Sequence, residues 1–165
     1  MGTRSVLAVN LEKQTKKGPS YRFQYLQFDG YPTCQLRRIL EAVMPKMSRV
    51  DIDWNQENAA KRFREFLEAY FKFRSFDSGH SIGNTWVGPM LTPERFSDKC
   101  WAEWLYVFEP NWKLIVTCVR TKRSQTIDLM DSTIWASLGY EKYSDGLTAK
   151  ANAFCKMVEK SLQKD

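Results

Sequence analysis

Polar and apolar residues alternate near the start of the chain with the period of two that is typical of β-strands. The clearest segment is 21–28 (YRFQYLQF), whose aromatic residues at odd positions are expected to share one face of a sheet. The segment 3–10 (TRSVLAVN) is apolar and β-branched, which predicts a preceding strand. The charged segment 11–20, which ends in Gly-Pro-Ser, predicts a loop that joins the two strands as an antiparallel pair.

A second pair of apolar segments flanks Glu109-Pro110-Asn111, a sequence typical of a tight turn. These segments are 101–108 (WAEWLYVF) and 112–119 (WKLIVTCV), and together they predict a hairpin. The segment 125–130 predicts an additional edge strand.

Three segments carry apolar residues at the helical period. A first helix is expected to begin after Thr33 as its N-cap and to end at Pro45. Asp53 and Gln56 have capping-box spacing, which predicts that a second helix begins there and ends near Arg74. The apolar stripes are Leu36, Ile39, Leu40 and Val43; Ala59, Phe63, Phe66, Leu67, Tyr70 and Phe71; and Leu147, Ala151, Phe154, Val158 and Leu162 of a C-terminal helix.

The segment 75–91 contains several glycines and one proline, and it predicts a long loop. Loops of this length in small domains are often functional, so His80 within it is a candidate recognition residue. A catalytic Ser-His pair is the less favoured interpretation, because adjacent Ser and His residues rarely have the orientation that a nucleophile needs. The sequence Thr92-Pro93-Glu94 then predicts the start of a short helix.

This order of elements predicts the α+β class: an antiparallel sheet of about four or five strands, with helices packed mainly on one face. The chain of 165 residues is expected to form one domain, residues 1–165. A hydrophobic fraction of 43% and an aromatic fraction of 14% exclude a disordered chain. The sequence shows neither a signal peptide nor a membrane-spanning run, and we expect a soluble intracellular protein.

Composition also limits the chemistry. A single histidine excludes metal sites that need two or more histidines from one chain, and we expect no metal and no cofactor. The four cysteines, which are widely spaced, are expected to be reduced and mostly buried (Cys34, Cys100, Cys118 and Cys155).

The formal charge is +6, from 25 Lys and Arg against 19 Asp and Glu. The basic residues are dispersed and interleaved with acids such as Glu65 and Glu68, which favours a solvated surface. Binding of nucleic acid or another polyanion is the alternative. The aromatic residues of the predicted strands also have two interpretations: they fill the core, or they form a surface on which nucleobases stack.

Glu103 is expected in the middle of a strand between two tryptophans, where a charge is unusual. Its structural interpretation is an ion pair across the sheet with Arg4 or Arg22. Its functional interpretation is a site formed with other carboxylates, for acid–base or metal chemistry.

Three motifs resemble a loose family of small proteins encoded by bacteriophages and some bacterial genomes. They are the TRS strand at 3–5, QFDGYP at 27–32, and EWLYVF at 103–108 followed by Trp112. Members of the family typically have a TRS-type strand, a WDGYP segment and an E-Y-x-Y-x-F hairpin. This chain has Gln27-Phe28 where His-Trp is common, and a longer basic first loop. The resemblance implies a phage accessory role and no established chemistry.

The matched residues are expected to meet at one sheet edge. Together with the loop histidine, they form the predicted binding set: Arg4, Gln27, Asp29, Tyr31, His80, Glu103 and Tyr106. The structural alternative is that Asp-Gly-Tyr-Pro is a strand-to-helix turn and that Arg4 pairs with a carboxylate.

The sequence favours binding over catalysis. The function we expect is that of an accessory protein in the cytoplasm of the host cell, which binds a host defence protein or its anionic nucleotide signal and needs no membrane. The alternatives are a nucleic-acid-binding protein or nuclease, and a small hydrolase that depends on Asp29 or Glu103.

Overall fold

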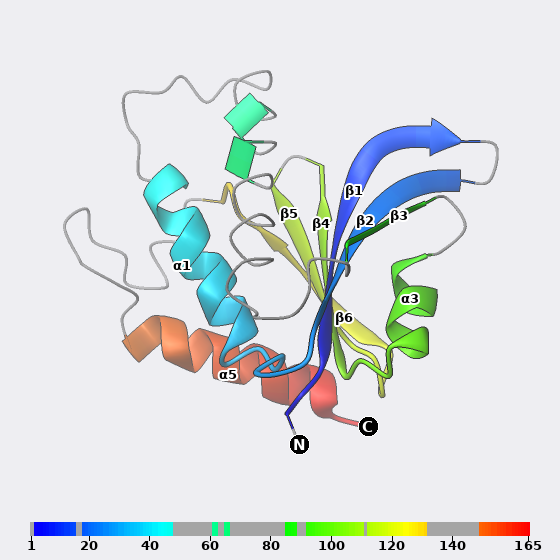
Figure 1. Ribbon diagram of the computed structural model, residues 1–165. Coiled ribbons are helices and arrows are strands. Elements are labelled where there is room, and N and C mark those ends of the chain that lie inside the picture. The colour runs from blue at the N-terminus through cyan, green and yellow to red at the C-terminus, as the bar shows by residue number, and fades with distance from the viewer. Residues whose placement is uncertain are drawn as a thin grey trace.

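The computed structural model describes residues 2–15, 18–47, 61–62, 65–66, 85–88, 92–110, 112–131 and 149–165. Within this part of the chain, six strands form one sheet in the order β3-β2-β1-β4-β5-β6 (Figure 1). The strands are β1 (Ser5–Thr15), β2 (Gly18–Leu26), β3 (Thr85–Gly88), β4 (Trp104–Glu109), β5 (Lys113–Cys118) and β6 (Arg123–Asp128). The helices are α1 (Gln35–Met47), α3 (Pro93–Lys99) and α5 (Ala149–Gln163).

The α+β class is confirmed, and the sheet is mixed rather than purely antiparallel. Strands β1 and β4 run parallel, whereas the other four neighbouring pairs are antiparallel. A parallel pair needs a long crossover connection, which the chain from β2 to β4 provides. Alternation of side chains does not reveal which strands are neighbours, so the sequence alone could not show this pair.

The larger core lies between one face of the sheet and the helices α1 and α5 (Figure 1). The four apolar residues predicted for the first helix are fully buried, because their spacing places them on one side of α1. In α5, buried residues follow the same period, which confirms the predicted C-terminal helix (Ala151, Cys155, Val158 and Leu162).

Helix α3 covers the opposite face of the sheet and completes a smaller core. The ring of Phe96 in α3 stacks on Phe23 in β2, with ring centroids 4.5 Å apart. Because both faces of β1 are covered, Val6, Leu7 and Ala8 are all fully buried. A strand that is buried on both faces has a continuous apolar run, as β1 does.

Three predicted boundaries are wrong. The segment 11–20 was expected to be a loop, yet β1 extends to Thr15 and β2 begins at Gly18. Part of the expected 75–91 loop is β3, an edge strand that pairs with β2. Helix α1 continues to Met47, past Pro45, although a proline at that position removes one backbone hydrogen bond of the helix.

Most of the predicted second helix, like the rest of the 75–91 loop, lies outside the described residues. The described residues of the predicted second helix, 61–62 and 65–66, have helical backbone. Among them, Phe66 is buried against Phe108 and Trp112. None of the described helices is both long and apolar enough to span a membrane.

Candidate functional site

Strand register brings several connections together at one end of the sheet. Ser5 pairs with both Leu26 and Trp104, and Trp104 pairs in turn with Cys118. The chain therefore leaves β2, enters β4 and leaves β5 at the end where β1 begins. We call this the Ser5 end; the segments found there are 2–4, 27–34, 101–103 and 119–122.

Hydrogen bonds join these segments through their backbones. Gly30 donates its N–H to the carbonyl of Thr3 at 2.9 Å, and Glu103 donates its N–H to the carbonyl of Arg4 at 2.9 Å. The hydroxyl of Tyr106 donates to the carbonyl of Gly30 at 2.7 Å. The three motifs behind the family resemblance thus meet in space, although they meet at a strand end rather than at a sheet edge.

Gly30 is required by this close approach. A Cβ atom at this position would lie 2.7 Å from the Ser5 Cβ and 2.8 Å from the Thr3 carbonyl oxygen. Atoms that close would force the chain segments apart. The Asp-Gly-Tyr-Pro segment is therefore a strand-to-helix turn, as its structural interpretation holds.

Two predicted site residues differ from their expected environment. Tyr106 is fully buried in the larger core, so its hydroxyl serves the fold. Glu103 was expected in the middle of a strand, yet it precedes β4 and its side chain is exposed. The expected ion pair between Glu103 and Arg4 does not occur, and the described part of the chain gives Glu103 no other ion pair.

Arg4 lies on the α3 side of the sheet, near Tyr25. Burial raises the pKa of Tyr25, and the positive charge of Arg4 acts in the opposite direction. The Arg4 Nε atom is buried without a hydrogen-bond partner among the described residues. Among the predicted site residues that the structure describes, Arg4 is therefore the one whose side chain has a buried hydrogen-bond donor without a partner.

The remaining predicted residues surround the turn before α1. Asp29 has a left-handed backbone with φ of 55° and pairs with Arg38 at 3.6 Å, an exposed ion pair of small energetic value. Gln27 is exposed. The side-chain hydrogen bond between Tyr31 and the neighbouring Cys34 is the largest cause that raises the pKa of Tyr31. His80 lies outside the described residues.

Thr33 does not cap α1, contrary to the prediction. Its backbone N–H and its hydroxyl both donate to the Glu159 carboxylate of α5, at 3.4 and 3.2 Å. A carboxylate at a helix N-terminus satisfies free N–H groups there. Tertiary contact thus replaces the local cap that the sequence suggested.

The sequence GHSIG at 79–83 has the Gly-x-Ser-x-Gly spacing of a nucleophile elbow, in which a helix follows the serine. Strand β3 begins at Thr85, so the described chain does not continue as that helix.

Trp101 is the residue that sequence reasoning missed. Its side chain is 75% exposed and its backbone is left-handed, with φ of 53°. It follows the C-cap of α3: Ala102 donates to the Ser97 carbonyl at 2.9 Å, and Trp101 donates to the Asp98 carbonyl at 3.2 Å. These two bonds form a Schellman motif with Trp101 at the position that glycine usually occupies. The unusual position of Trp101 follows from where α3 ends, which the sequence pattern alone does not show.

A second exposed aromatic residue, Phe28, lies at the Ser5 end. It is 55% exposed and follows β2 by two residues. The strand aromatics that stack in the core, such as Phe23, Phe108 and Trp112, confirm the core interpretation for those positions. Trp101 and Phe28 are exceptions, because their rings face solvent.

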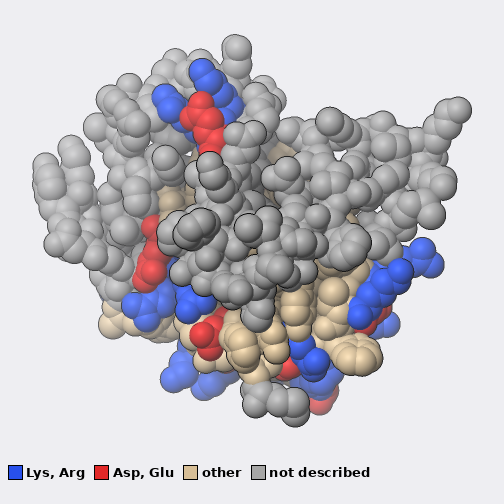
Figure 2. All heavy atoms as spheres, viewed as in Figure 1, with Lys and Arg blue, Asp and Glu red and all other residues tan. Residues whose placement is uncertain are grey.

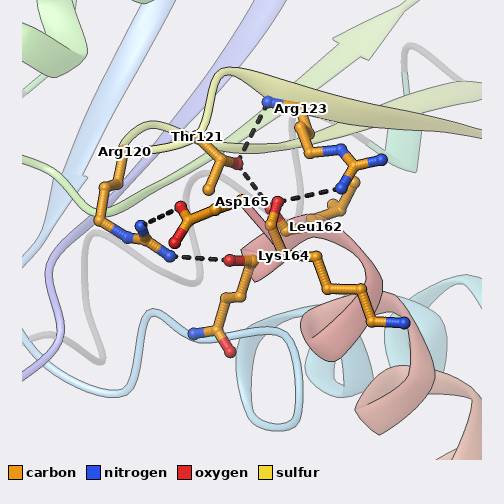
Figure 3. Close-up of polar contacts among 7 residues, drawn as sticks. Arg120, Thr121, Arg123, Leu162, Lys164 and Asp165 are labelled. Atoms are coloured by element: carbon orange, nitrogen blue, oxygen red, sulfur yellow. Dashed lines mark hydrogen bonds and ion pairs between the residues drawn. The ribbon is translucent and has the colours of Figure 1, made fainter.

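Basic side chains from the turn between β5 and β6 also lie at the Ser5 end, where they hold the C-terminus of α5 (Figure 3). Arg120 pairs with Asp165 at 2.7 Å and donates to the Gln163 carbonyl at 2.8 Å. Further bonds run from Thr121 to the Leu162 carbonyl and from Arg123 to the Lys164 carbonyl. These donors satisfy carbonyls that the helix end leaves free.

Charge elsewhere is mixed. Figure 2 shows Lys and Arg in separate groups, several of them beside Asp or Glu. Pairs such as Arg37–Glu41 and Arg62–Glu65 account for part of this pattern. Within the described residues, no group of three or more His, Cys, Asp or Glu side chains could hold a metal ion.

The Ser5 end therefore combines two exposed aromatic rings with cationic side chains, on segments held by backbone hydrogen bonds. Membership of the phage-encoded family stays a prediction that rests on sequence motifs. No protein-family model matches the sequence, and neither the curated proteins nor the solved structures contain a match to it.

Proposed function

We propose that this chain is a phage accessory protein that acts by binding, in the cytoplasm of the host cell. Its partner is a host defence protein or the anionic nucleotide that such a defence uses as a signal. The contact surface is the Ser5 end of the sheet. The observation that carries the proposal is the exposed indole of Trp101 on a strained, left-handed backbone.

Trp101 is costly to the folded chain. A left-handed backbone costs a residue with a Cβ atom about 1–2 kcal/mol, and glycine would avoid that cost. Trp101 is 75% exposed as a residue, so the core gains little from the indole in return. Strained backbone is concentrated at functional positions, and tryptophan is enriched among the residues that dominate binding energy.

The surroundings of Trp101 support an anionic partner. Phe28 adds a second exposed ring at the same end, and the partly exposed guanidinium groups of Arg38 and Arg120 each pair with a carboxylate of this chain that an anionic partner would replace. Aromatic rings stack on nucleobases, and guanidinium groups bind phosphates or carboxylates in bidentate pairs. The net charge of +6 favours the approach of an anion over long range.

The direct test is capture of partners from host-cell extract by the wild-type chain and by Trp101→Gly. Bound proteins and extracted nucleotides are identified by mass spectrometry. We expect the partner to be captured by the wild type and lost in Trp101→Gly. Met157→Ala is the matched control, because Met157 is an exposed apolar residue of α5. Equal capture by wild type and Trp101→Gly would contradict the proposal.

Nucleic acid is the second candidate partner, because exposed aromatics beside arginines also suit single strands. Binding of a labelled oligonucleotide should then weaken steeply as salt concentration rises. Absence of binding at low salt would exclude this candidate. The hydrolase alternative has less support, because Asp29 pairs with Arg38.

A further inference from the structure

A pocket of about 250 Å³ lies on the α3 side of the sheet, and Val119 and Lys122 of the Ser5 end form part of its lining. Helix α3 packs on β1, β2 and β4, so the pocket forms between its edge and the neighbouring faces of β4, β5 and β6. The residues that line it are Glu94, Asp98, Leu105, Thr117, Val119, Lys122 and Ser124.

The floor of the pocket is a row of cross-strand neighbours. Leu105 in β4 pairs with Thr117 in β5, and Thr117 pairs with Ser124 in β6. The Thr117 and Ser124 hydroxyl oxygens lie 3.0 Å apart and share a hydrogen bond. Each hydroxyl oxygen keeps a lone pair for another donor. Leu105 and Val119 add apolar surface beside this hydroxyl pair.

One wall of the pocket is acidic. Glu94 and Asp98 are four residues apart on α3, which places both carboxylates on the same side of the helix. Both residues are exposed, and neither forms an ion pair with a described Lys or Arg. Asp98 lies near the helix C-terminus, where a negative charge opposes the helix dipole. Helix stability therefore does not explain the presence of Asp98.

Lys122 stands at another part of the rim, in the turn between β5 and β6, with a left-handed backbone. It forms no ion pair with either of these described carboxylates, so the pocket lining carries both negative and positive charge. Such a pocket complements a ligand that carries a cation at one end and an anion or a carbonyl oxygen at the other.

We propose that this pocket binds the guanidinium group of arginine. The group is planar with five N–H donors, which can reach the Glu94 and Asp98 carboxylates and the hydroxyl pair together. The aliphatic stem lies on Leu105 and Val119, and Lys122 binds the ligand's carboxylate or carbonyl oxygen. Pockets for whole drug-sized ligands have volumes of about 300–1,000 Å³, so this one suits a single side chain.

The test is a titration of the isotopically labelled protein with L-arginine, followed by NMR, with L-citrulline as the neutral control of similar shape. We expect saturable shifts at the Leu105 and Val119 methyls and at the Thr117 amide with arginine alone. Nα-acetyl-L-arginine amide distinguishes the two sources of the group. Equal affinity indicates an arginine side chain of a partner, and weaker affinity indicates free arginine held by Lys122.

Two variants locate the binding site. Glu94→Gln and Asp98→Asn keep the side-chain shape, and each should weaken arginine binding about tenfold by removing a charged hydrogen bond. Glu65→Gln, at an exposed carboxylate outside the pocket, should leave the affinity unchanged. Absence of arginine-dependent shifts, equal shifts with citrulline, or unchanged affinity in both pocket variants would overturn the proposal. Because the titration uses arginine alone, its outcome can be distinguished from loss of the partner that is proposed to bind Trp101.

Discussion

At the scale of single residues, the fold tolerates tryptophan at a position that suits glycine. Trp101 adopts φ of 53° in a Schellman motif, and Trp112 adopts φ of 63° with its ring buried. The two cases differ, because Trp112 fills the core and Trp101 does not. Backbone strain at Trp112 is offset by burial of its large ring, whereas the folded monomer has no such compensation at Trp101.

We therefore expect Trp101→Gly to stabilise the protein while it abolishes binding. Relief of the left-handed backbone, less the greater freedom of glycine in the unfolded chain, should raise the free energy of unfolding by about 0.5–1 kcal/mol. Urea denaturation measures this change. Trp101→Ala is the control, since it removes the indole and keeps the Cβ strain, and its stability should be close to that of the wild type. Destabilisation by Trp101→Gly would show that the indole supports the fold.

Tyr106 is expected to act on stability and not on binding. Its buried hydroxyl donates to the Gly30 carbonyl at 2.7 Å, so Tyr106→Phe removes a buried hydrogen bond and should cost about 1–3 kcal/mol. Denaturation of the variant measures the loss, and partner capture below the unfolding transition should be unchanged. Selective loss of capture at full stability would return Tyr106 to the binding set.

At the scale of elements, polar side chains connect neighbouring strands and helix ends. On the central strands, the Glu109 carboxylate of β4 accepts bonds from Asn10 of β1 at 2.9 Å and from Tyr21 of β2 at 3.3 Å. At the Ser5 end, the turn between β5 and β6 holds the C-terminus of α5 (Figure 3). Both sets of contacts join segments that are far apart in the sequence.

The contact between Tyr21 and Glu109 should make stability depend on pH. Burial, followed by the charge and hydrogen bond of Glu109, raises the pKa of Tyr21 to about 12. An unfolded tyrosine titrates near pH 10, so between about pH 10 and 12 the unfolded chain loses a proton that the folded chain keeps. Stability from this tyrosine is complete below pH 10 and declines as pH rises toward 12. Urea titrations of wild type and Tyr21→Phe should show a shallower decline in the variant; identical declines would contradict this assignment.

The hydrogen bonds that hold the C-terminus of α5 predict a local effect. Thr121 donates to the Leu162 carbonyl at 2.6 Å, so Thr121→Val should cost about 1 kcal/mol and loosen the last turn of α5. Hydrogen exchange of the amides in that turn measures the loosening. Thr126→Val, at an exposed position of β6, should leave the same amides protected. Equal protection in the two variants would show that the bond is not needed.

At the scale of the whole molecule, two cores share one sheet. The core under α1 and α5 holds most of the large buried side chains, and the core under α3 is smaller. Strands β1 and β4 contribute to both cores, so the loss of either core weakens the other. Such sharing favours unfolding in a single transition.

Phe66 tests this cooperativity. Its ring lies 5.4 Å from Trp112 and 6.2 Å from Phe108, between centroids, in the larger core. Phe66→Ala should cost about 3–5 kcal/mol through a cavity. Circular dichroism and tryptophan fluorescence should still report one shared transition, at lower urea. Phe28→Ala, at an exposed ring, should leave the midpoint nearly unchanged. Two separate transitions in Phe66→Ala would show that the cores unfold independently.

Local pattern was sufficient for much of the fold and for little of the candidate site. The stripe from Leu36 to Val43, the Pro93 helix start and the hairpin around Glu109 are local features, and all three are confirmed. The binding set was chosen from motifs, and Tyr106 shows the limit of that choice. A tyrosine in an apolar strand has the same sequence pattern whether its hydroxyl faces a ligand or, as in Tyr106, the Gly30 carbonyl.

The sequence by itself determined which segments become strands and helices and which of their faces are apolar, because side-chain period and turn residues act over a few neighbouring positions. Tertiary structure alone decided that β1 and β4 run parallel, that Glu159 and not Thr33 serves the start of α1, and that Trp101 faces solvent. These outcomes depend on contacts between residues far apart in the chain, whose energies no local pattern contains.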